Sequence, residues 1–416
     1  MSETTGTAER RLRDHSPQIE AVRQALAERV GLANAEPVLD FASIFLARAP
    51  DAFMRGRSPS DLAGLTLGAF SFLESERPDR VGVSVMNPDK TNEGWSTRVT
   101  VVRANVTERP FIVDTIREFL HREGLAIAHI VYPLLDVERD AKGRVVAVRP
   151  ASDGGTKESL VHCEIERVKD PARLAHLAEE LKRRVQDVVR ATDDFAPMLR
   201  ALDAVVEELA SRIAGDPDGT HELSEIQAFL SWLREGAFVF LGYRAYELVA
   251  SHAGEPSVVV QPGSGLGVLR NEAASRFAEP VPLSRVPAPV RALAEHGPML
   301  IISKTNAEAT VHRASRMDYI GVKRVDAEGR TIGEHRFLGL FTSKAYGEAA
   351  ENIPILRRKL ARVLEGARVR QGSHDYKAMI TIFNSLPRTE LFVSSAEEIA
   401  ADVRTVLTSY GTDEVR

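Results

Sequence analysis

The sequence has 416 residues, a length that predicts roughly two to four structural modules rather than one core. Hydrophobic residues make up 44% and charged residues 27% of the chain, the balance of an ordinary globular protein. The formal net charge of −5 argues against nucleic acid as a main partner, because chains that neutralise phosphates are usually basic.

Membrane and disulfide classes are also disfavoured. No apolar run approaches the roughly 18 residues that cross a bilayer, and residues 1–20 contain no apolar stretch typical of a signal peptide. Cys163 is the single cysteine, which excludes an intrachain disulfide and a thiolate metal cluster. We expect a cytoplasmic protein with no membrane partner.

Residues 1–77 are predicted to form a helical amino-terminal region. Hydrophobic residues recur there at helical spacing, as at Ile19, Val22, Leu26 and Val30.

Residues 78–191 have a mixed pattern. It predicts strands at 81–86 and 97–106, a helix over 112–120, an apolar segment over 125–137 that Pro133 interrupts, a strand at 160–166 and a helix from Pro171. This order matches a ferredoxin-like sandwich, an antiparallel sheet with two helices on one face. In 160–166, apolar residues alternate with His162, Glu164 and Glu166, which predicts that one face of the sheet meets water.

The remaining chain divides into three predicted regions. Residues 192–236 read as a helical connector, 237–348 as an antiparallel β domain, and 349–416 as a helical region that leads to a further module. Strands are expected at 237–249, 298–303, 317–325 and 332–342, and a proline-rich surface loop at 280–291. The predicted fold class is α+β.

The glycine run Gly263-Ser264-Gly265-Leu266-Gly267 follows a strand-like segment, a context in which a dinucleotide-binding loop can occur. The fingerprint requires a third glycine where Val268 stands, and no clear helix start follows. A tight turn between strands is the favoured interpretation.

Other chemical groups give weak signals. His312, Arg313, Ser315 and Asp318 include the residue types of a nucleophilic site, but no motif places Ser315 beside a base. No histidine pair has metal-ligand spacing, and Cys163 reads as a small buried residue. A basic cluster reads as a solvated helix face, with an acidic partner surface as the alternative; it comprises Arg357, Arg358, Lys359, Arg362, Arg368 and Arg370.

The segment 105–111 joins the first central strand to the first helix of the sandwich. Helix amino termini attract carboxylates, so an amino-acid effector could bind there, and a plain strand-to-helix turn is the equal alternative. The candidate effector-binding residues are Asn105, Thr107, Glu108, Arg109 and Phe111.

These blocks together resemble a known family. Residues 109–140 (RPFIVDTIREFL and onward) and 158–174 resemble the ACT-like module near the amino terminus of the large NAD-specific glutamate dehydrogenases. Further blocks follow in the family's order, at 238–248, 263–270, 309–324, 335–346, 351–365 and 372–392. The resemblance runs from about residue 54 to residue 400.

The resemblance implies an ACT-like module at 78–191 and a PAS-like module in 237–348. It implies a regulatory and assembly region of an enzyme of amino-acid catabolism that oxidises L-glutamate to 2-oxoglutarate and ammonium with NAD. The family's catalytic residues and dinucleotide fold have no counterpart here, so we expect no cofactor in this chain, which we read as a piece of a longer protein. The implied partners are a catalytic domain of the same polypeptide or sister subunits in a homo-oligomer.

One departure concerns the candidate effector site. Amino-acid-binding ACT modules usually carry a glycine after the proline of the first turn, where this chain has Phe111 after Pro110. The side chain of Phe111 would crowd a ligand carboxylate, which favours an assembly role. A free-standing amino-acid sensor and a self-contained enzyme that uses His312 are the alternative hypotheses.

Overall fold

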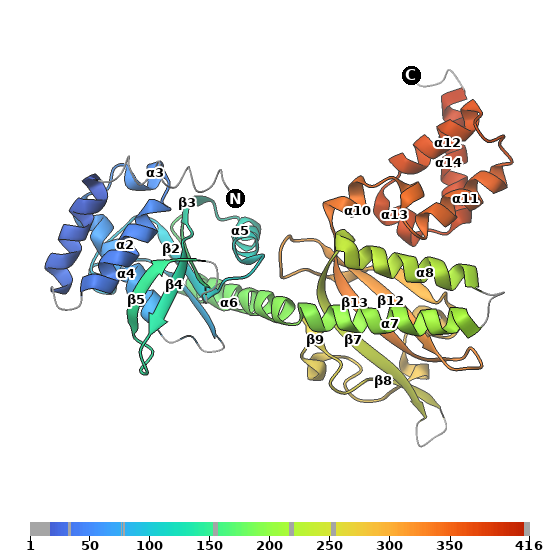
Figure 1. Ribbon diagram of the computed structural model, residues 1–416, viewed down its shortest axis with the longest axis horizontal. Coiled ribbons are helices and arrows are strands. Elements are labelled where there is room, and N and C mark those ends of the chain that lie inside the picture. The colour runs from blue at the N-terminus through green and yellow to red at the C-terminus, as the bar shows by residue number, and fades with distance from the viewer. Residues whose placement is uncertain are drawn as a thin grey trace. The chain divides into compact units, whose positions relative to one another are not determined.

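A computed structural model describes residues 17–31, 35–75, 77, 80–152, 157–215, 220–250 and 255–411. The α+β class is confirmed, and the chain forms two compact units. The first unit comprises Met1–Val189 with Thr310–Ala314, and the second comprises Arg190–Ala309 with Ser315–Arg416 (Figure 1).

The first unit opens with helices, as predicted. They are a helix at 17–30, α2 (Ala35–Ala47), α3 (Asp51–Met54) and α4 (Pro59–Glu74). Ser58 caps α4, because its hydroxyl accepts the N–H of Asp61 at 3.1 Å, and Pro59 follows at the first helical position. Apolar side chains of these helices are buried together in one core.

A six-stranded antiparallel sheet follows. Its strands are β1 (Val81–Met86), β2 (Thr100–Thr107), β3 (Ile127–Val131), β4 (Leu134–Arg139), β5 (Val145–Pro150) and β6 (Lys157–Ile165). The helix α5 (Ile112–Arg122) follows β2, and α6 (Pro171–Asp193) follows β6. The strand order is β1-β2-β6-β4-β5, and β3 also pairs with β6. From β2 onward the expected order of strand, helix, strands and helix is present, and β1 adds an edge strand ahead of it.

Local sequence explains the turns of this sheet. The apolar run 125–137 is split between β3 and β4 at Pro133, which cannot donate a ladder hydrogen bond. A hairpin turn joins β4 to β5, where the N–H of Gly143 donates to the carbonyl of Asp140 at 2.9 Å and Gly143 has a φ of 79°.

The prediction of a sheet face open to water is wrong. His162 and Glu164 of β6 are fully buried, because the amino-terminal helices cover that face while α5 and α6 lie on the other (Figure 1). The rings of Phe45 and Phe53 meet the ring of His162 edge-on, at 5.7 and 6.0 Å between centroids. His162 and Glu164 therefore face a second helical layer instead of solvent, whereas Glu166, just past the end of β6, is exposed.

Arg103 on β2 is the largest of the fully buried side chains and lies on this covered face. Its guanidinium donates to both carboxylate oxygens of Glu93 at 2.8 Å and to the carbonyl of Gly68 in α4 at 3.0 Å. A Cβ atom at position 68 would collide with the Glu93 carboxylate, so glycine lets α4 lie directly over the ion pair. Burial alone would raise the pKa of Glu93, but Arg103 holds it below the usual value.

A second buried group surrounds Glu164. The guanidinium of Arg57 donates to Glu164 at 2.6 Å, and the Nε2 atom of His162 lies 4.0 Å from the same carboxylate. Burial lowers the pKa of His162 to about 4. Burial alone would raise the pKa of Glu164, but His162 and Arg57 lower it to about 2.

The second unit contains a seven-stranded antiparallel sheet with the order β10-β8-β7-β13-β12-β11, and β9 also pairs with β7. The strands are β7 (Phe238–Ala250), β8 (Pro256–Val260), β9 (Leu266–Gly267), β10 (Val281–Pro282), β11 (Leu300–Glu308), β12 (Arg316–Val325) and β13 (Thr331–Phe341). A hairpin turn joins β12 to β13, where the Gly329 N–H donates to the Asp326 carbonyl at 3.1 Å.

Helices cover one face of this second sheet. They are α7 (Phe195–Gly215) and α8 (Thr220–Trp232), with a π-helical turn at Leu233–Ala237 leading into β7 (Figure 1). The carboxyl-terminal helices are α10 (Ser343–Gly347), α11 (Leu356–Ala367), α12 (His374–Ser385), α13 (Arg388–Val393) and α14 (Ala396–Gly411).

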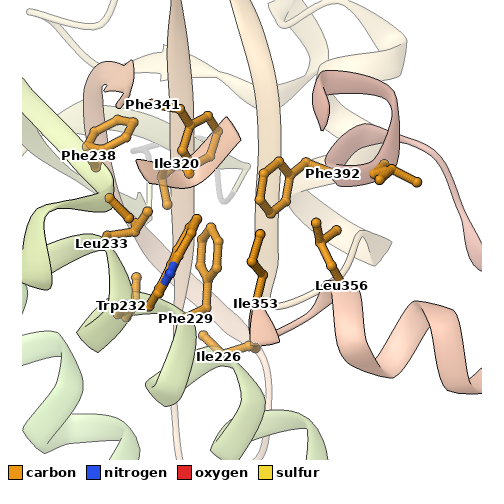
Figure 2. Close-up of a cluster of buried hydrophobic side chains, with 14 of the residues drawn as sticks. Ile226, Phe229, Trp232, Leu233, Phe238, Ile320, Phe341, Ile353, Leu356 and Phe392 are labelled. Carbon is orange, nitrogen blue, oxygen red and sulfur yellow. The ribbon is translucent and has the colours of Figure 1, made fainter. Parts of the chain in front are cut away.

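One apolar core joins the sheet of the second unit to its carboxyl-terminal helices. The rings of Phe341 (β13) and Phe392 (α13) stack at 4.7 Å with an interplanar angle of 8°, and Trp232 and Phe229 pack beside them. Figure 2 shows these side chains meeting Leu356 of α11 in the same cluster. Sheet and helical segments of the second unit therefore share buried surface and should unfold together.

The predicted loop at 280–291 is only partly correct. A helix, α9 (Ala288–His296), begins inside it, with Pro287 at its N-cap and another proline within its first turn. None of its residues is buried. The proline cluster therefore both bends the chain and starts a helix.

Within the described residues, no helix combines the length and apolar character needed to span a bilayer.

The buried pair beneath α4 generates a stability prediction. Glu93→Gln should destabilise the first unit by about 3–5 kcal/mol, because it leaves the Arg103 charge buried without a countercharge. Urea unfolding, followed by Trp95 fluorescence in a Trp232→Phe background, isolates this unit because these are the only two tryptophans. Glu138→Gln breaks the exposed pair with Arg149 and should leave the midpoint nearly unchanged. Equal midpoints for the two variants would contradict the prediction.

His162 generates a pH prediction. Its folded pKa of about 4 lies below the ordinary value of 6.5, so the unfolded chain gains a proton first as the pH falls. The stabilisation is present above pH 6.5 and is lost towards pH 4, so the first unit should lose about 2 kcal/mol between pH 6.5 and 4.5. Glu164 loses its contribution only as the pH falls below 4.5. His162→Gln should flatten this dependence, whereas the exposed control His176→Gln should keep it; equal slopes would refute the assignment.

Candidate functional site

The turn between β2 and α5 has an uncommon backbone conformation. Phe111 precedes α5 with a φ of 75°, in the left-handed region that non-glycine residues seldom adopt. His312 of the first unit has a φ of 71°, and its ring lies 5.0 Å from that of Phe111. Phe111 and His312 are two strained residues in contact, and backbone strain clusters at functional sites. We therefore take this turn as the candidate site.

Hydrogen bonds fix the segment 310–314 to α5 and α6. The N–H of His312 donates to Oγ1 of Thr115 at 3.0 Å, and the hydroxyl of Thr310 donates to Asp187 at 2.8 Å. The Nδ1 atom of His312 lies 3.7 Å from Asp114 Oδ2, beyond hydrogen-bond distance. The segment is therefore positioned mainly by the two hydroxyl contacts.

Glu108 lies at the same turn and accepts two hydroxyl groups. Tyr132 donates to its carboxylate at 2.7 Å, and Ser159 donates to the same oxygen. Burial raises the pKa of the Tyr132 phenol well above its usual value, and the neighbouring Glu108 charge adds to this. One carboxylate oxygen of Glu108 is thus hydrogen-bonded to two hydroxyl groups within the protein.

The structure does not bring the five sequence-predicted residues together. Asn105 is fully buried on the face covered by the amino-terminal helices, where its amide donates to Glu158 and to the Ser159 carbonyl at 3.2 Å. The side chain of Arg109 donates to the Thr107 carbonyl at 3.0 Å and to the Val189 carbonyl at 3.3 Å. Glu108 and Phe111 remain at the turn itself.

A groove of about 560 Å³ runs beside this turn, and we call it the α5 groove. It is lined by Asp114, Arg117, Glu118, His121, Leu125, Ala126, Ile127, His312 and Arg313. Its lining combines carboxylates with guanidinium groups, so both the carboxylate and the ammonium group of an amino acid would find an opposite charge. A sequence pattern does indicate a polar face on α5, because its lining residues recur at helical spacing; they are Asp114, Arg117, Glu118 and His121.

The glycine run 263–267 forms a turn, as the favoured interpretation predicted. The N–H groups of Gly263 and Gly265 donate to the carboxylate of Glu272, and that of Gly267 donates to Asp194 at 2.7 Å. Gly267 has a φ of 60°, and a Cβ atom there would collide with the Leu241 carbonyl. Glycine is needed for close strand packing, and the N–H groups that would hold a pyrophosphate already bind internal carboxylates.

The candidate residues of a nucleophilic site contact different partners and do not form one site. Ser315 donates to the Arg316 carbonyl, and Asp318 forms an ion pair with Lys304 and accepts the N–H of Phe341. His312 contacts Phe111 and Thr115 instead. Within the described residues, no group of three or more His, Cys, Asp or Glu side chains could hold a metal ion. Cys163 is buried, as predicted, and burial raises the pKa of its thiol to about 12.

Comparison with known proteins agrees with this architecture. Residues 41–181 match the family model of the glutamate dehydrogenase ACT1 domain, and residues 353–411 match that of glutamate dehydrogenase helical motif 1. The ACT1 match begins at residue 41 and so includes part of the amino-terminal helices as well as the sheet. The segment that matches the ACT1 model lies within the first unit.

Curated relatives identify the family. The chain is 32% identical over 389 residues to the NAD-specific glutamate dehydrogenase of Halomonas elongata. This alignment covers 92% of the chain and 24% of the relative. It is 29% identical over 398 residues to that of Pseudomonas aeruginosa (95% and 24%), and 26% identical over 299 residues to that of Mycobacterium tuberculosis (71% and 17%). The chain belongs to the large NAD-specific glutamate dehydrogenase family and corresponds to its amino-terminal region, about a quarter of the length of the first two relatives. The PAS-like assignment of the second sheet stays a prediction.

The contact between Thr115 and His312 is testable. Thr115→Val removes the acceptor of the His312 N–H, so amide exchange in 310–314 should accelerate about tenfold, the equivalent of roughly 1.4 kcal/mol. Hydrogen–deuterium exchange with mass spectrometry of a peptide that spans these residues measures this. Asp114→Asn, which weakens only a partly exposed contact, is the matched control and should leave the rate within about twofold. Unchanged exchange in Thr115→Val would show that the hydrogen bond does not hold the segment.

Proposed function

We propose that this chain is the regulatory and assembly region of a large NAD-dependent glutamate dehydrogenase. In that enzyme, L-glutamate would be oxidised to 2-oxoglutarate and ammonium with reduction of NAD, by residues outside this chain. The observation that carries the proposal is the correspondence of nearly the whole chain to about a quarter of the relatives, including the ACT1 and helical motif segments.

The internal engagement of the candidate chemical groups supports a role other than catalysis. The turn carboxylate of Glu108 is satisfied by Tyr132 and Ser159, and the glycine run is closed by Glu272. Groups held this firmly suit a scaffold that positions other parts of an enzyme. The partners would be the catalytic domain of the same polypeptide or sister subunits in a homo-oligomer, and a cytoplasmic location remains our prediction.

An amino-acid effector is the ligand class that the α5 groove fits best. Its acidic residues Asp114 and Glu118 and its basic residues Arg117 and Arg313 offer opposite charges to the two ends of an amino acid. The Phe111 ring is packed against His312 at the turn, where a glycine would have left backbone N–H groups accessible. We therefore favour binding along α5 over binding at the turn residues.

A free-standing amino-acid sensor is the alternative function. The same groove would serve it, so the difference lies in whether the chain acts within a dehydrogenase. A sensor would bind an amino acid with saturable heat and would have no catalytic partner.

The two functions separate in a paired assay. The purified chain should form no NADH from glutamate and NAD, while the longer natural protein that we propose to contain it should turn over under the same conditions. Turnover by the chain alone would refute the non-catalytic role. Calorimetric titration with the common amino acids tests the groove: loss of binding in Arg117→Ala, with retention in the exposed control Arg173→Ala, is the expected result if an effector binds. Absence of activity in the longer protein, combined with amino-acid binding by the chain, would favour the sensor.

A further inference from the structure

The second sheet ends in an open edge at β11. The N–H of Lys323 donates to the Met299 carbonyl at 2.9 Å, and Leu300 pairs with Val322. In an antiparallel ladder the backbone groups alternate in direction, so those of Ile301 point towards β12 and those of Leu300 and Ile302 point away from it. Within the described residues, no hydrogen bond reaches the outward groups of these two residues.

A groove of about 610 Å³ follows this edge, and we call it the β11 groove. The side chains of Leu300 and Ile302 pack against the core that contains α11, so one side of the groove is formed by α11 and the start of α14. Leu293 of α9 and Val393 at the end of α13 also line it, with 38% and 51% of their surface exposed. An open backbone edge thus lies beside apolar side chains that are still in contact with water.

The β11 groove also carries basic charge from the cluster noted in the sequence. Arg357 is bound by Glu225 at 2.6 Å, and the ammonium group of Lys359 donates to carbonyl groups at the end of α13. Arg358 and Arg362, one helical turn apart on α11, line the groove, and within the described residues neither has an ion-pair partner. The solvated-face interpretation therefore fails for Lys359 and leaves these two arginines as the available charges.

The acidic residues of the groove lie at the amino-terminal ends of helices. Glu222 and Glu397 lie in the first turns of α8 and α14, where the helix dipole stabilises a carboxylate. Glu398 accepts the N–H of Ser395 at 2.8 Å as part of the cap of α14. Arg358 and Arg362 are therefore the basic groups of the groove that remain available to the carboxylates of a ligand.

We propose that the β11 groove binds an extended acidic segment of another polypeptide, which adds to the sheet as a strand beside β11. Outward backbone groups of Leu300 and Ile302 would pair with the added strand. Its side chains would alternate, with carboxylates facing Arg358 and Arg362 on the α11 side and apolar side chains facing Leu293 on the other. The β11 groove is thus an interaction surface in addition to those of the proposed regulatory role.

Fluorescence anisotropy with a labelled peptide of alternating valine and glutamate tests the charge requirement. Arg358→Glu with Arg362→Glu should weaken binding at least about tenfold, as expected for loss of two charge-assisted contacts. The matched control is Arg368→Glu with Arg370→Glu, which makes the same change of charge in the same cluster away from the groove lining, and it should stay within about twofold. Equal weakening by both pairs, or equal binding of a valine–lysine peptide, would overturn the proposal.

Strand addition is tested separately. Ile302→Pro removes one outward N–H, a change that an edge strand tolerates, and should abolish binding, whereas Ile302→Val keeps the N–H and should bind normally. Circular dichroism checks that both variants are folded. Unchanged affinity of a folded Ile302→Pro variant, absence of saturable binding by the unmodified chain, or a dimer that buries this edge and excludes the peptide would each refute the proposal. None of these results depends on whether the chain acts within a dehydrogenase.

Discussion

The first unit depends on one constraint: a charge removed from water must meet an opposite charge or enough hydrogen bonds. Because helices cover both faces of its sheet, Arg103, Glu164 and His162 are buried in a layer where ordinary sheets would place apolar residues. Arg103 pairs with Glu93 and Glu164 pairs with Arg57, and both partners come from other segments. These contacts fix the amino-terminal helices in one position on the sheet, which apolar contact alone specifies less sharply.

The regular elements were largely accessible from sequence, because periodicity and turn chemistry are local. The β1 strand, the helix after Pro110 and both hairpins follow from valine runs, helical spacing and Asp–Gly turns. The buried polar face was not accessible. Alternation of His162 and Glu164 with apolar residues looks the same whether the polar side meets water or a second charged layer, since only distant residues such as Arg57 decide it. Likewise, the prolines at 280–291 concealed a helix start.

The candidate site shows the same division between local and distant information. The sequence placed five candidate residues around the turn before α5, but Asn105 lies inside β2 and bonds to Glu158, whereas Glu108 lies beyond the strand and bonds to Tyr132. His312 lies far along the chain, and no local pattern indicates that it packs on Phe111. The α5 groove could have been anticipated only in part, from the polar stripe on the helix.

The placement of residues 310–314 has a consequence for how this protein can be divided. The chain leaves β11 of the second unit, contributes five residues to the first unit, and returns as β12. A single break near residue 189 would therefore give a fragment that lacks the strip resting on Phe111 and Thr115. Excision of residues 190–416 as one block would also remove residues 310–314, which belong to the first unit.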